Sequence, residues 1–549
     1  MVFNAVSKIE AAMAGAESYE AWTEAALDHD AKTGMDRWKR MDQTRLYDHV
    51  EIRSRLDRLR ALRARHDDVG LLFALNEGIH GNMGGMGKPM LYARAKFGTK
   101  KLIGDYVDEI VSALEHLAAL PTGEITLEEK VDFFRRASHC FGRTALMLSG
   151  GGILGNYHMG VVKALIEQNL LPTVISGSSA GSIVAAVIGT NSDQQLARLI
   201  AAPALELEAR REASWFDRAL WGEHPQIDIH ELEEMIARLI PDLTFQEAFE
   251  KTGRHINISV APAEYLQTSR LLNAMTSPNV FVRKAVLASS AVPGVFPPVM
   301  LEAKTVGGDR QPYLPTRKWV DGSVQDDLPA KRLMRLYGVN HFIVSMVNPL
   351  VLPWISDPKT ERGVVALAAQ QAERWVKELI RAGVSTTQMF TRDWPRVNFI
   401  LSMFSSIATQ TYTGDVNIIP RARLFDPRKL LSHPTEEEVL SFVKEGERAT
   451  WPKLEMIRIS TRISRTLDRI LADYDALEIE LAAESAHRPK AERSARASAR
   501  GRTTGTRSKM PVTGTRPKVP ATGTRPKVPD TAKAPARRRK PAHQVPPAN

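Results

Sequence analysis

Ser179 is the residue of this sequence whose surroundings best suit nucleophilic chemistry. It is the third residue of Gly177-Ser178-Ser179-Ala180-Gly181, a G-x-S-x-G pattern that follows a short apolar stretch and precedes an apolar helical one. The glycines of this pattern allow a sharp turn from a strand into a helix, and the turn exposes the serine hydroxyl. The N-terminus of the helix then favours negative charge at the same place. A glycine-rich turn without chemistry is the alternative that the pentapeptide alone leaves open.

A second glycine-rich segment could stabilise the negative charge that develops when a serine attacks an ester. Gly150, Gly151 and Gly152 follow the apolar strand predicted at 144–148, and a helical stretch comes after them. Consecutive glycines after a strand let backbone N–H groups converge on an oxyanion, and the N–H of Ala180 is a further candidate donor. A nucleotide phosphate could use similar geometry, but the segment has neither the G-x-G-x-x-G spacing nor a Gly-Lys-Ser/Thr ending.

A serine nucleophile also needs a base within hydrogen-bond reach. Asp321 ends an apolar stretch and precedes a glycine, which suits a carboxylate that faces a site, although Asp-Gly alone is more often a turn. The histidines that follow it lack the setting of a catalytic triad: His341, His433, His487 and His543. The sequence therefore favours a Ser179–Asp321 dyad in which the carboxylate acts directly as the base.

Together these segments resemble the patatin-like acyl hydrolases, which use a Ser-Asp dyad on an α/β sheet. The resemblance rests on residues 150–152, 177–181 and 321–322, and it extends to the patatin-like triacylglycerol lipases of fungi and plants. The further segments that resemble this branch lie at residues 78–87, 156–165, 271–280, 292–298 and 341–349. Because several separate motifs occur in order over roughly residues 15–420, the resemblance is specific.

The resemblance implies a three-layer α/β/α catalytic domain with a largely parallel sheet, preceded by a helical domain. It implies that Ser179 and Asp321 are catalytic, that the glycine loop and Ala180 form the oxyanion hole, and that Gly177 and Gly181 shape the elbow. The implied activity is triacylglycerol hydrolysis at a lipid–water interface. A phospholipase A or lysophospholipase is the alternative enzyme, and a lipid-surface scaffold is the alternative without catalysis. No cofactor or metal motif occurs in the sequence.

The pattern along the chain predicts four regions. Residues 1–140 have helical periodicity, and residues 141–350 alternate strands with helices, as a parallel sheet between helix layers does. Residues 351–486 read as a mixed and then helical extension, with a helix at 361–382. Residues 487–549 are rich in Pro, Ala, Thr and Gly and have too few large apolar residues to form a core, so they are predicted to be a disordered tail.

The chain's net charge of +11 belongs to this tail. Residues 487–549 contain 17 Lys and Arg against two acidic residues, so they carry +15 and the rest of the chain carries −4. Recurring cations on an extended, proline-bearing backbone bind polyanions through phosphates without base specificity. The predicted partner is an anionic lipid surface, because the body resembles a lipase, and nucleic acid is the alternative.

One predicted helix admits two interpretations. Over residues 452–481 apolar residues recur every three or four positions, and four arginines follow the same spacing on a neighbouring face: Arg458, Arg462, Arg465 and Arg469. Such a helix could lie in a membrane interface. It could equally pack on the protein body with its charges in solvent, which is the interpretation that we favour.

Cysteine content and the lack of a leader bear on location. The single cysteine, Cys140, excludes an internal disulfide and fits a reducing compartment, and we expect it to be a buried small hydrophobic residue. Residues 1–20 have no compact apolar core of the signal-peptide kind. The uncharged stretch 170–192 contains the elbow, a proline and several glycines, so it is not expected to span a membrane. The sequence predicts a cytoplasmic protein and leaves peripheral membrane association open.

Overall fold

The computed structural model describes residues 2–79, 81–121, 123–201, 229–264, 267–293, 296–349, 351–352, 414–421 and 435–487. Its contacts divide the chain into one compact unit, Met1–Glu478, and a second, Ile479–Asn549, of which only the first residues are described. The helix predicted at 361–382 and the basic tail beyond His487 lie outside the described residues, as do His433 and His543.

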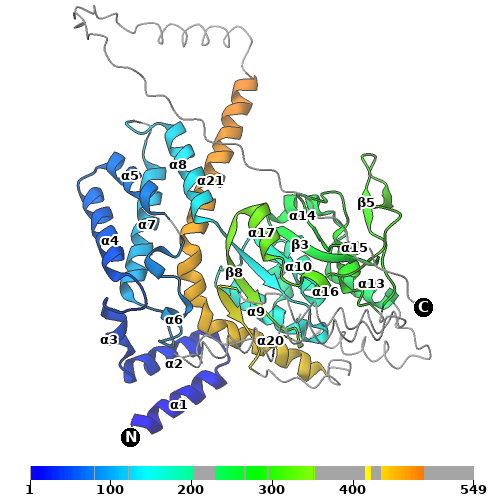
Figure 1. The fold of residues 1–549 in the computed structure, drawn as a ribbon, viewed down its shortest axis with the longest axis horizontal. Coiled ribbons are helices and arrows are strands. Elements are labelled where there is room, and N and C mark those ends of the chain that lie inside the picture. The colour runs from blue at the N-terminus through cyan, green and yellow to red at the C-terminus, as the bar shows by residue number, and fades with distance from the viewer. Residues whose placement is uncertain are drawn as a thin grey trace, which may run out of the picture. The chain divides into compact units, whose positions relative to one another are not determined.

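Helices make up the N-terminal part of the compact unit, as the periodicity predicts (Figure 1). They are α1 Val2–Gly15, α2 Tyr19–Lys32, α3 Met35–Arg40, α4 His49–Ala64, α5 Asp68–Gly78, the 3₁₀ helix η1 Met83–Gly85, α6 Pro89–Tyr92, α7 Lys101–Ala119 and α8 Leu127–Phe141. The longest of them, α7, buries an apolar face that runs from Leu102 to Leu117. Burial of such a face, more than helix propensity, stabilises helices of this length.

Helix α8 corrects one expectation from the sequence. It begins with a capping box, in which Thr126 and Glu129 each accept a hydrogen bond from the other's backbone N–H. Phe134 and Phe141 are buried, since residues seven apart lie on one face of a helix. Cys140 is exposed, so the expectation of a buried cysteine is wrong. Consecutive residues of a helix lie on different faces, so Cys140 points outward where the next residue, Phe141, points inward.

A mainly parallel sheet forms the centre of the rest of the compact unit. Within the described residues its strands are β1 Arg143–Leu148, β2 Val174–Gly177, β3 His255–Pro262, β4 Arg270–Leu272, β7 Trp319–Asp321, β8 Val339–Ser345 and β9 Val416–Ile418. The order is β4-β3-β2-β1-β8-β9, and β7 also pairs with β3. Among the strands that the structure describes in this sheet, β4 and β7 alone run antiparallel to their neighbour β3. A separate hairpin joins β5 Glu302–Lys304 to β6 Arg310–Pro312.

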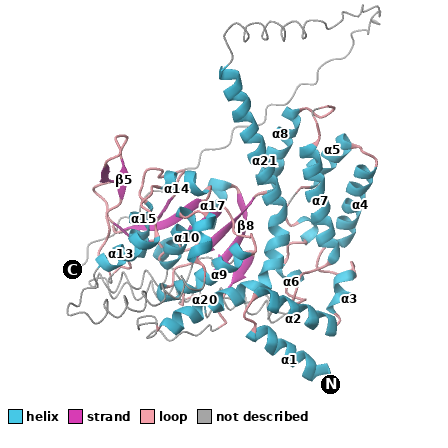
Figure 2. Ribbon diagram, turned by 180° about the vertical axis from the view of Figure 1, so that it is seen from behind, coloured by secondary structure: helices cyan, strands magenta, loops and turns pink. Residues whose placement is uncertain are grey.

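Helices surround this sheet (Figure 2). They are η2 Gly152–Gly155, α9 Asn156–Glu167, α10 Ala180–Thr190, α11 Asp193–Leu199, α13 Ile229–Leu239, α14 Phe245–Thr252, α15 Val282–Ser290, α16 Ser323–Asp326, α17 Ala330–Tyr337, α20 Glu436–Thr450, η4 Trp451–Lys453 and α21 Leu454–His487. Three of them, α11, α14 and α20, begin with the same kind of capping box as α8. Helices lie between β1 and β2, between β2 and β3, and between β7 and β8, which confirms the predicted alternation of strands and helices.

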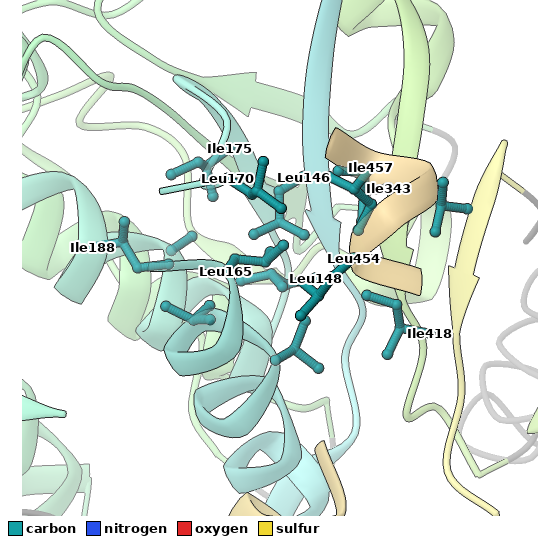
Figure 3. Packing of buried hydrophobic residues seen from close by; sticks show 14 of the residues in the cluster. Leu146, Leu148, Leu165, Leu170, Ile175, Ile188, Ile343, Ile418, Leu454 and Ile457 are labelled. Atoms are coloured by element: carbon teal, nitrogen blue, oxygen red, sulfur yellow. The ribbon is translucent and has the colours of Figure 1, made fainter. Parts of the chain in front are cut away.

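Both faces of the sheet are apolar, because helices cover both. On one face, residues of four strands pack against α9, α10 and the start of α21 (Figure 3). The labelled members of this cluster are Leu146, Leu148, Leu165, Leu170, Ile175, Ile188, Ile343, Ile418, Leu454 and Ile457. On the other face, Met147 and Val344 belong to a smaller cluster with Leu333 of α17. Successive strand residues point to opposite faces, so one strand serves both clusters.

Helix α21 packs on the protein body, which confirms the favoured interpretation. The buried apolar residues along its middle are Ile463, Leu467 and Ile470. Arg462 pairs with Asp108 and Arg469 pairs with Glu115, both on α7. Two of the four arginines therefore meet acidic side chains of a neighbouring helix. Among the helices that the structure describes, none contains an apolar stretch long enough to cross a membrane.

Candidate active site

Strand β3 brings Ser179 and Asp321 to one place. The last residue of β2 lies opposite Ile258, and Asp321, the last residue of β7, lies opposite Val260. Strand β4 pairs with the other edge of the same residues, so β2 and β7 share one edge of β3. Because β2 runs parallel and β7 antiparallel to β3, their C-terminal ends approach each other with a single β3 residue between them.

Ser179 occupies the turn between β2 and α10 in a strained backbone conformation. Its φ is +50° and its ψ is −127°. A non-glycine residue seldom adopts this region, at a cost of roughly 1–3 kcal/mol, and the G-x-S-x-G elbow requires such a turn. The flanking glycines allow close packing, because a side chain at Gly177 would collide with the Gly181 carbonyl, and one at Gly181 with the Leu148 carbonyl. The turn thus has the geometry of the predicted elbow.

Asp321 is a buried carboxyl group, 2% exposed. Burial raises the pKa of this carboxyl to about 6. Hydrogen bonding from the Ser323 N–H at 2.8 Å, and from the Ser179 and Ser323 side chains, lowers the pKa and so limits the rise. The Ser179 side chain therefore lies near enough to interact with the Asp321 carboxyl. A carboxyl group with a pKa near 6 is mostly ionised at neutral pH and can accept a proton.

Ser289 of α15 ties the elbow to β3. The Ser179 N–H donates to Ser289 Oγ at 3.0 Å, and this hydroxyl donates to the Ser259 carbonyl oxygen at 2.8 Å. Ser289 is fully buried. Since Ser259 is the β3 residue between the ends of β2 and β7, this relay fixes the nucleophile relative to Asp321.

Gly150 lies directly beside the nucleophile. A substituent on its α-carbon would come within 3.2 Å of Ser179 Cβ. The Gly150 N–H donates to Asp327 Oδ1 at 2.7 Å. This N–H is therefore engaged within the fold, and Gly150 departs from the predicted role of an oxyanion donor. The physical reason is a buried carboxylate that local sequence spacing does not place beside the loop.

Gly151, Gly152 and Ala180 stay candidates for the oxyanion donors. Gly152 begins η2 with a φ of +56°, and Ala180 is the first residue of α10. Neither the Gly151 N–H nor the Ala180 N–H has a hydrogen-bond partner within the part of the chain that the structure describes. The first N–H groups of any helix lack intrahelical partners, which makes this position suitable for an anion.

Asp327 is a second buried carboxyl group at the site, and the sequence analysis does not single it out. It accepts hydrogen bonds from the Gly150 N–H, the Ser178 hydroxyl and, at 3.3 Å, the Asn348 side-chain amide. Burial raises its pKa to about 7, and the negative charge of Asp321 adds to the rise. Its position shortly after Asp321 is the sequence signal that could have drawn attention to it. Ser178 lies inside the elbow motif, yet nothing in that motif indicates its partner.

The histidines near the sheet do not take the place of the base. His341 lies at the start of β8, at the end of the sheet opposite the elbow, where its Nδ1 is 3.1 Å from Thr144 Oγ1. His158 of α9 is fully buried, with Nδ1 2.7 Å from Ser345 Oγ and Nε2 2.9 Å from the Ser149 carbonyl oxygen. Burial lowers the pKa of His158 to about 4, so its ring is neutral. This geometry agrees with a carboxylate base.

Other features of the compact unit lie apart from the serine. A cavity of about 330 Å³ beside β9 and α20 is lined by residues that include Tyr92, Asp415 and Arg448. Neither Ser179 nor Asp321 lines it, so we assign it no part in ester chemistry. Over the described ranges, no group of three or more His, Cys, Asp or Glu side chains is arranged to hold a metal ion.

Gly151→Val should lower kcat for ester hydrolysis about 10²-fold. A Cβ at this position would lie 2.5 Å from Val347 Cγ2 and 3.1 Å from the Val347 carbonyl oxygen, so the loop and its N–H groups must shift. Steady-state kinetics with a soluble short-chain ester measures the effect. Gly104→Val on α7, where the added side chain meets nothing within 4 Å, is the control. Unchanged kinetics in Gly151→Val would remove this loop from the mechanism.

Two parts of this chain match known protein families. Residues 146–334 match the family described as patatin-like phospholipase, and residues 4–139 match a domain of unknown function, DUF3336. Triacylglycerol lipase ptl3 of Schizosaccharomyces pombe is 33% identical over 473 residues, which cover 82% of this chain and 94% of that protein. Triacylglycerol lipase SDP1L of Arabidopsis thaliana is 33% identical over 475 residues, which cover 83% of this chain and 57% of that protein.

Among solved structures, VipD from Legionella pneumophila aligns with 58% of this chain and 67% of its own, at 13% identity and a TM-score of 0.29. Of the two lipases, the match to this chain spans nearly all of ptl3 but little more than half of SDP1L. The match to ptl3 extends over most of both proteins, across the helical region and the sheet. Because this chain carries both a DUF3336 match and a patatin-like match and is 33% identical to ptl3 over most of both proteins, it belongs to the patatin-like phospholipase family of carboxylic ester hydrolases.

Proposed function

We propose that this chain is a lipid acyl hydrolase in which Ser179 is the nucleophile and Asp321 the general base. The observation that carries the proposal is the placement of an elbow serine, in its strained backbone conformation, beside a buried carboxyl group whose pKa lies near 6. Such a carboxylate can accept the serine proton at neutral pH, and a serine becomes a competent nucleophile only when a base accepts that proton.

The proposed reaction has two halves that use the same groups. Ser179 Oγ attacks the ester carbonyl carbon while Asp321 takes the hydroxyl proton, and the N–H groups of Gly151 and Ala180 stabilise the oxyanion. The bond to the alcohol oxygen then breaks, Asp321 protonates the leaving alcohol, and the acyl group stays on Ser179. Water next gives a proton to Asp321 and attacks the acyl-enzyme. The fatty acid leaves as Ser179 recovers its proton.

Long-chain triacylglycerol is the substrate that we propose. Its support is the match to two relatives that are named triacylglycerol lipases. Phospholipid is the second candidate, because the matched family is described as patatin-like phospholipase. Both substrates offer a fatty acyl ester to the same dyad, so the head group is what distinguishes them.

A substrate panel tests this proposal. The purified chain is given triacylglycerol, phosphatidylcholine or lysophosphatidylcholine in matched mixed micelles, and fatty acid release is measured. We expect the fastest release from triacylglycerol and none from any substrate in Ser179→Ala. Faster release from either phospholipid would favour the phospholipase alternative. If the wild-type chain cleaved none of the three, the lipid acyl hydrolase proposal would be wrong.

We also propose that the basic tail, residues 487–549, binds anionic lipid surfaces. Its support is the charge of +15 on this segment, because each cation near such a surface contributes about 1 kcal/mol. Deletion of residues 488–549 should weaken binding to vesicles that contain phosphatidylserine, and the difference from the full chain should shrink as salt rises. Hydrolysis of a soluble ester should not change. Equal vesicle binding by the truncated chain at low salt, or tighter binding of the tail to DNA or RNA, would contradict the lipid proposal.

A further inference from the structure

Two side chains hold one peptide group of the glycine loop from opposite edges. Between Ser149 and Gly150, the carbonyl oxygen accepts from His158 Nε2 at 2.9 Å and the N–H donates to Asp327 Oδ1 at 2.7 Å. The C=O and N–H of a trans peptide point in opposite directions within one plane, so these two bonds fix the plane. A carbonyl oxygen only accepts, which assigns the ring proton to Nε2, and Nδ1 then accepts from the Ser345 hydroxyl at 2.7 Å.

The next peptide group is held at its carbonyl edge. The Gly150 carbonyl oxygen accepts from Ser149 Oγ at 3.1 Å, and the same Oγ accepts from the Val347 N–H at 2.9 Å. The Gly151 N–H points the opposite way in this plane. It has no hydrogen-bond partner among the residues described, so it is available as a donor beside Ser179.

We propose that Asp327 and His158 are positioning residues that clamp the Ser149–Gly150 peptide and thereby aim the Gly151 N–H at the oxyanion. This inference rests on the proposed ester hydrolysis, and neither side chain touches the reacting atoms in it. Asp327 also binds the hydroxyl of Ser178, the residue before the nucleophile. One carboxylate therefore fixes the oxyanion loop and the elbow relative to each other. Accuracy matters here, since a displacement of about 1 Å can cost about 10²-fold in rate.

Asp327 shares the site with a second negative charge throughout the reaction. The negative charge of Asp321 helps to raise the pKa of Asp327 to about 7. When Asp321 takes the serine proton, its negative charge passes to the oxyanion, so the site keeps one negative charge near Asp327 while the oxyanion exists. Among the other titratable neighbours, Asp326 pairs with Arg332 at 3.3 Å, and burial lowers the pKa of His158 to about 4. Asp321, whose pKa burial raises to about 6, and Asp326, whose pKa burial also raises, are therefore the titratable carboxyl neighbours of Asp327.

Variants of Asp327 and a matched control separate the clamp from general stability. Asp327→Ala removes the acceptor of the Gly150 N–H and should lower kcat about 10²-fold with little change in KM. Asp327→Asn keeps an oxygen of the same shape and should recover kcat to within about tenfold of wild type. The control is Asp30→Ala on α2, a fully buried carboxylate that accepts the N–H groups of Lys96 and Phe97 at 2.9 and 3.0 Å. It should lower the melting temperature without lowering kcat.

The pH dependence is a readout that a purely structural role would not move. In the wild type, kcat/KM should fall in two steps as pH decreases. The first, of up to about tenfold, lies near pH 7, where Asp327 takes a proton; the second lies below pH 6, where Asp321 does. Asp327→Asn should keep only the second step. Wild-type kcat in Asp327→Ala, or the two-step profile in Asp327→Asn, would overturn the clamp.

Two further measurements keep the inference testable. If Asp327→Ala does not fold, His158→Leu and His158→Gln test the other edge of the peptide. Of the two replacements, only glutamine can still donate a hydrogen bond to the Ser149 carbonyl oxygen, so it should keep the higher kcat. Equal kcat in the two variants would overturn the clamp. Amide hydrogen exchange over residues 146–155 is independent of hydrolysis. It should be faster in Asp327→Ala than in Asp30→Ala, and equal exchange would reject the clamp even in an inactive chain. Different results would contradict the proposed function itself. They are a wild-type chain without esterase activity, or a Ser179→Ala variant that is active.

Discussion

Ser179→Ala should reduce kcat for ester hydrolysis about 10⁴-fold or more, to the background of the assay. Alanine lacks the oxygen that attacks the ester carbonyl, so the acyl-enzyme cannot form. The fold should persist, because the Ser179 backbone N–H still donates to Ser289 and the elbow glycines are unchanged. The melting temperature should therefore stay close to that of the wild type.

Continuous titration of released fatty acid, with a soluble short-chain ester as a second substrate, measures this loss. Ser464→Ala on α21 is the matched control, because it removes a buried serine hydroxyl that donates to the Thr461 carbonyl oxygen of its own helix. It should retain wild-type kcat. Undiminished hydrolysis by Ser179→Ala would mean that another residue is the nucleophile.

Asp321→Asn should reduce kcat about 10³- to 10⁴-fold. The amide has nearly the shape of the carboxyl group, so β7 and its pairing with β3 should be kept, but the amide cannot accept the serine proton. Asp326→Asn is the control on the same turn, since the Asp326 carboxylate pairs with Arg332 and not with Ser179. Full activity of Asp321→Asn would show that a different group is the base.

The pH profile gives the same assignment independently. Burial raises the pKa of Asp321 to about 6, so the carboxyl becomes protonated as pH falls through 6 and the base is lost. Below pH 6, kcat/KM should fall about tenfold per pH unit. An aspartate with its ordinary pKa near 4 would sustain activity about two pH units lower. Activity that persists unchanged to pH 4.5 would therefore exclude Asp321 in this buried state as the base.

Local sequence determined the turn geometry of the site. Gly177 and Gly181 around Ser179 predict a strained strand-to-helix turn, and consecutive glycines after an apolar strand predict a loop beside it; both are present. Such features depend on neighbouring residues along the chain, so spacing and residue type suffice to predict them. The alternation of strands and helices is predictable for the same reason, and the mainly parallel sheet follows from it.

Tertiary structure decided how the distant groups meet. Strand β3 pairs with β2 and with β7 along one edge, and this pairing brings the carboxyl of Asp321 to the serine. The same packing places Asp327 on the Gly150 N–H, which changes the role expected of Gly150. It also sets Arg462 and Arg469 of α21 against acidic side chains of α7. Hydrogen bonds and ion pairs between segments far apart in the chain depend on distances in space, and neither motif spacing nor periodicity contains those distances.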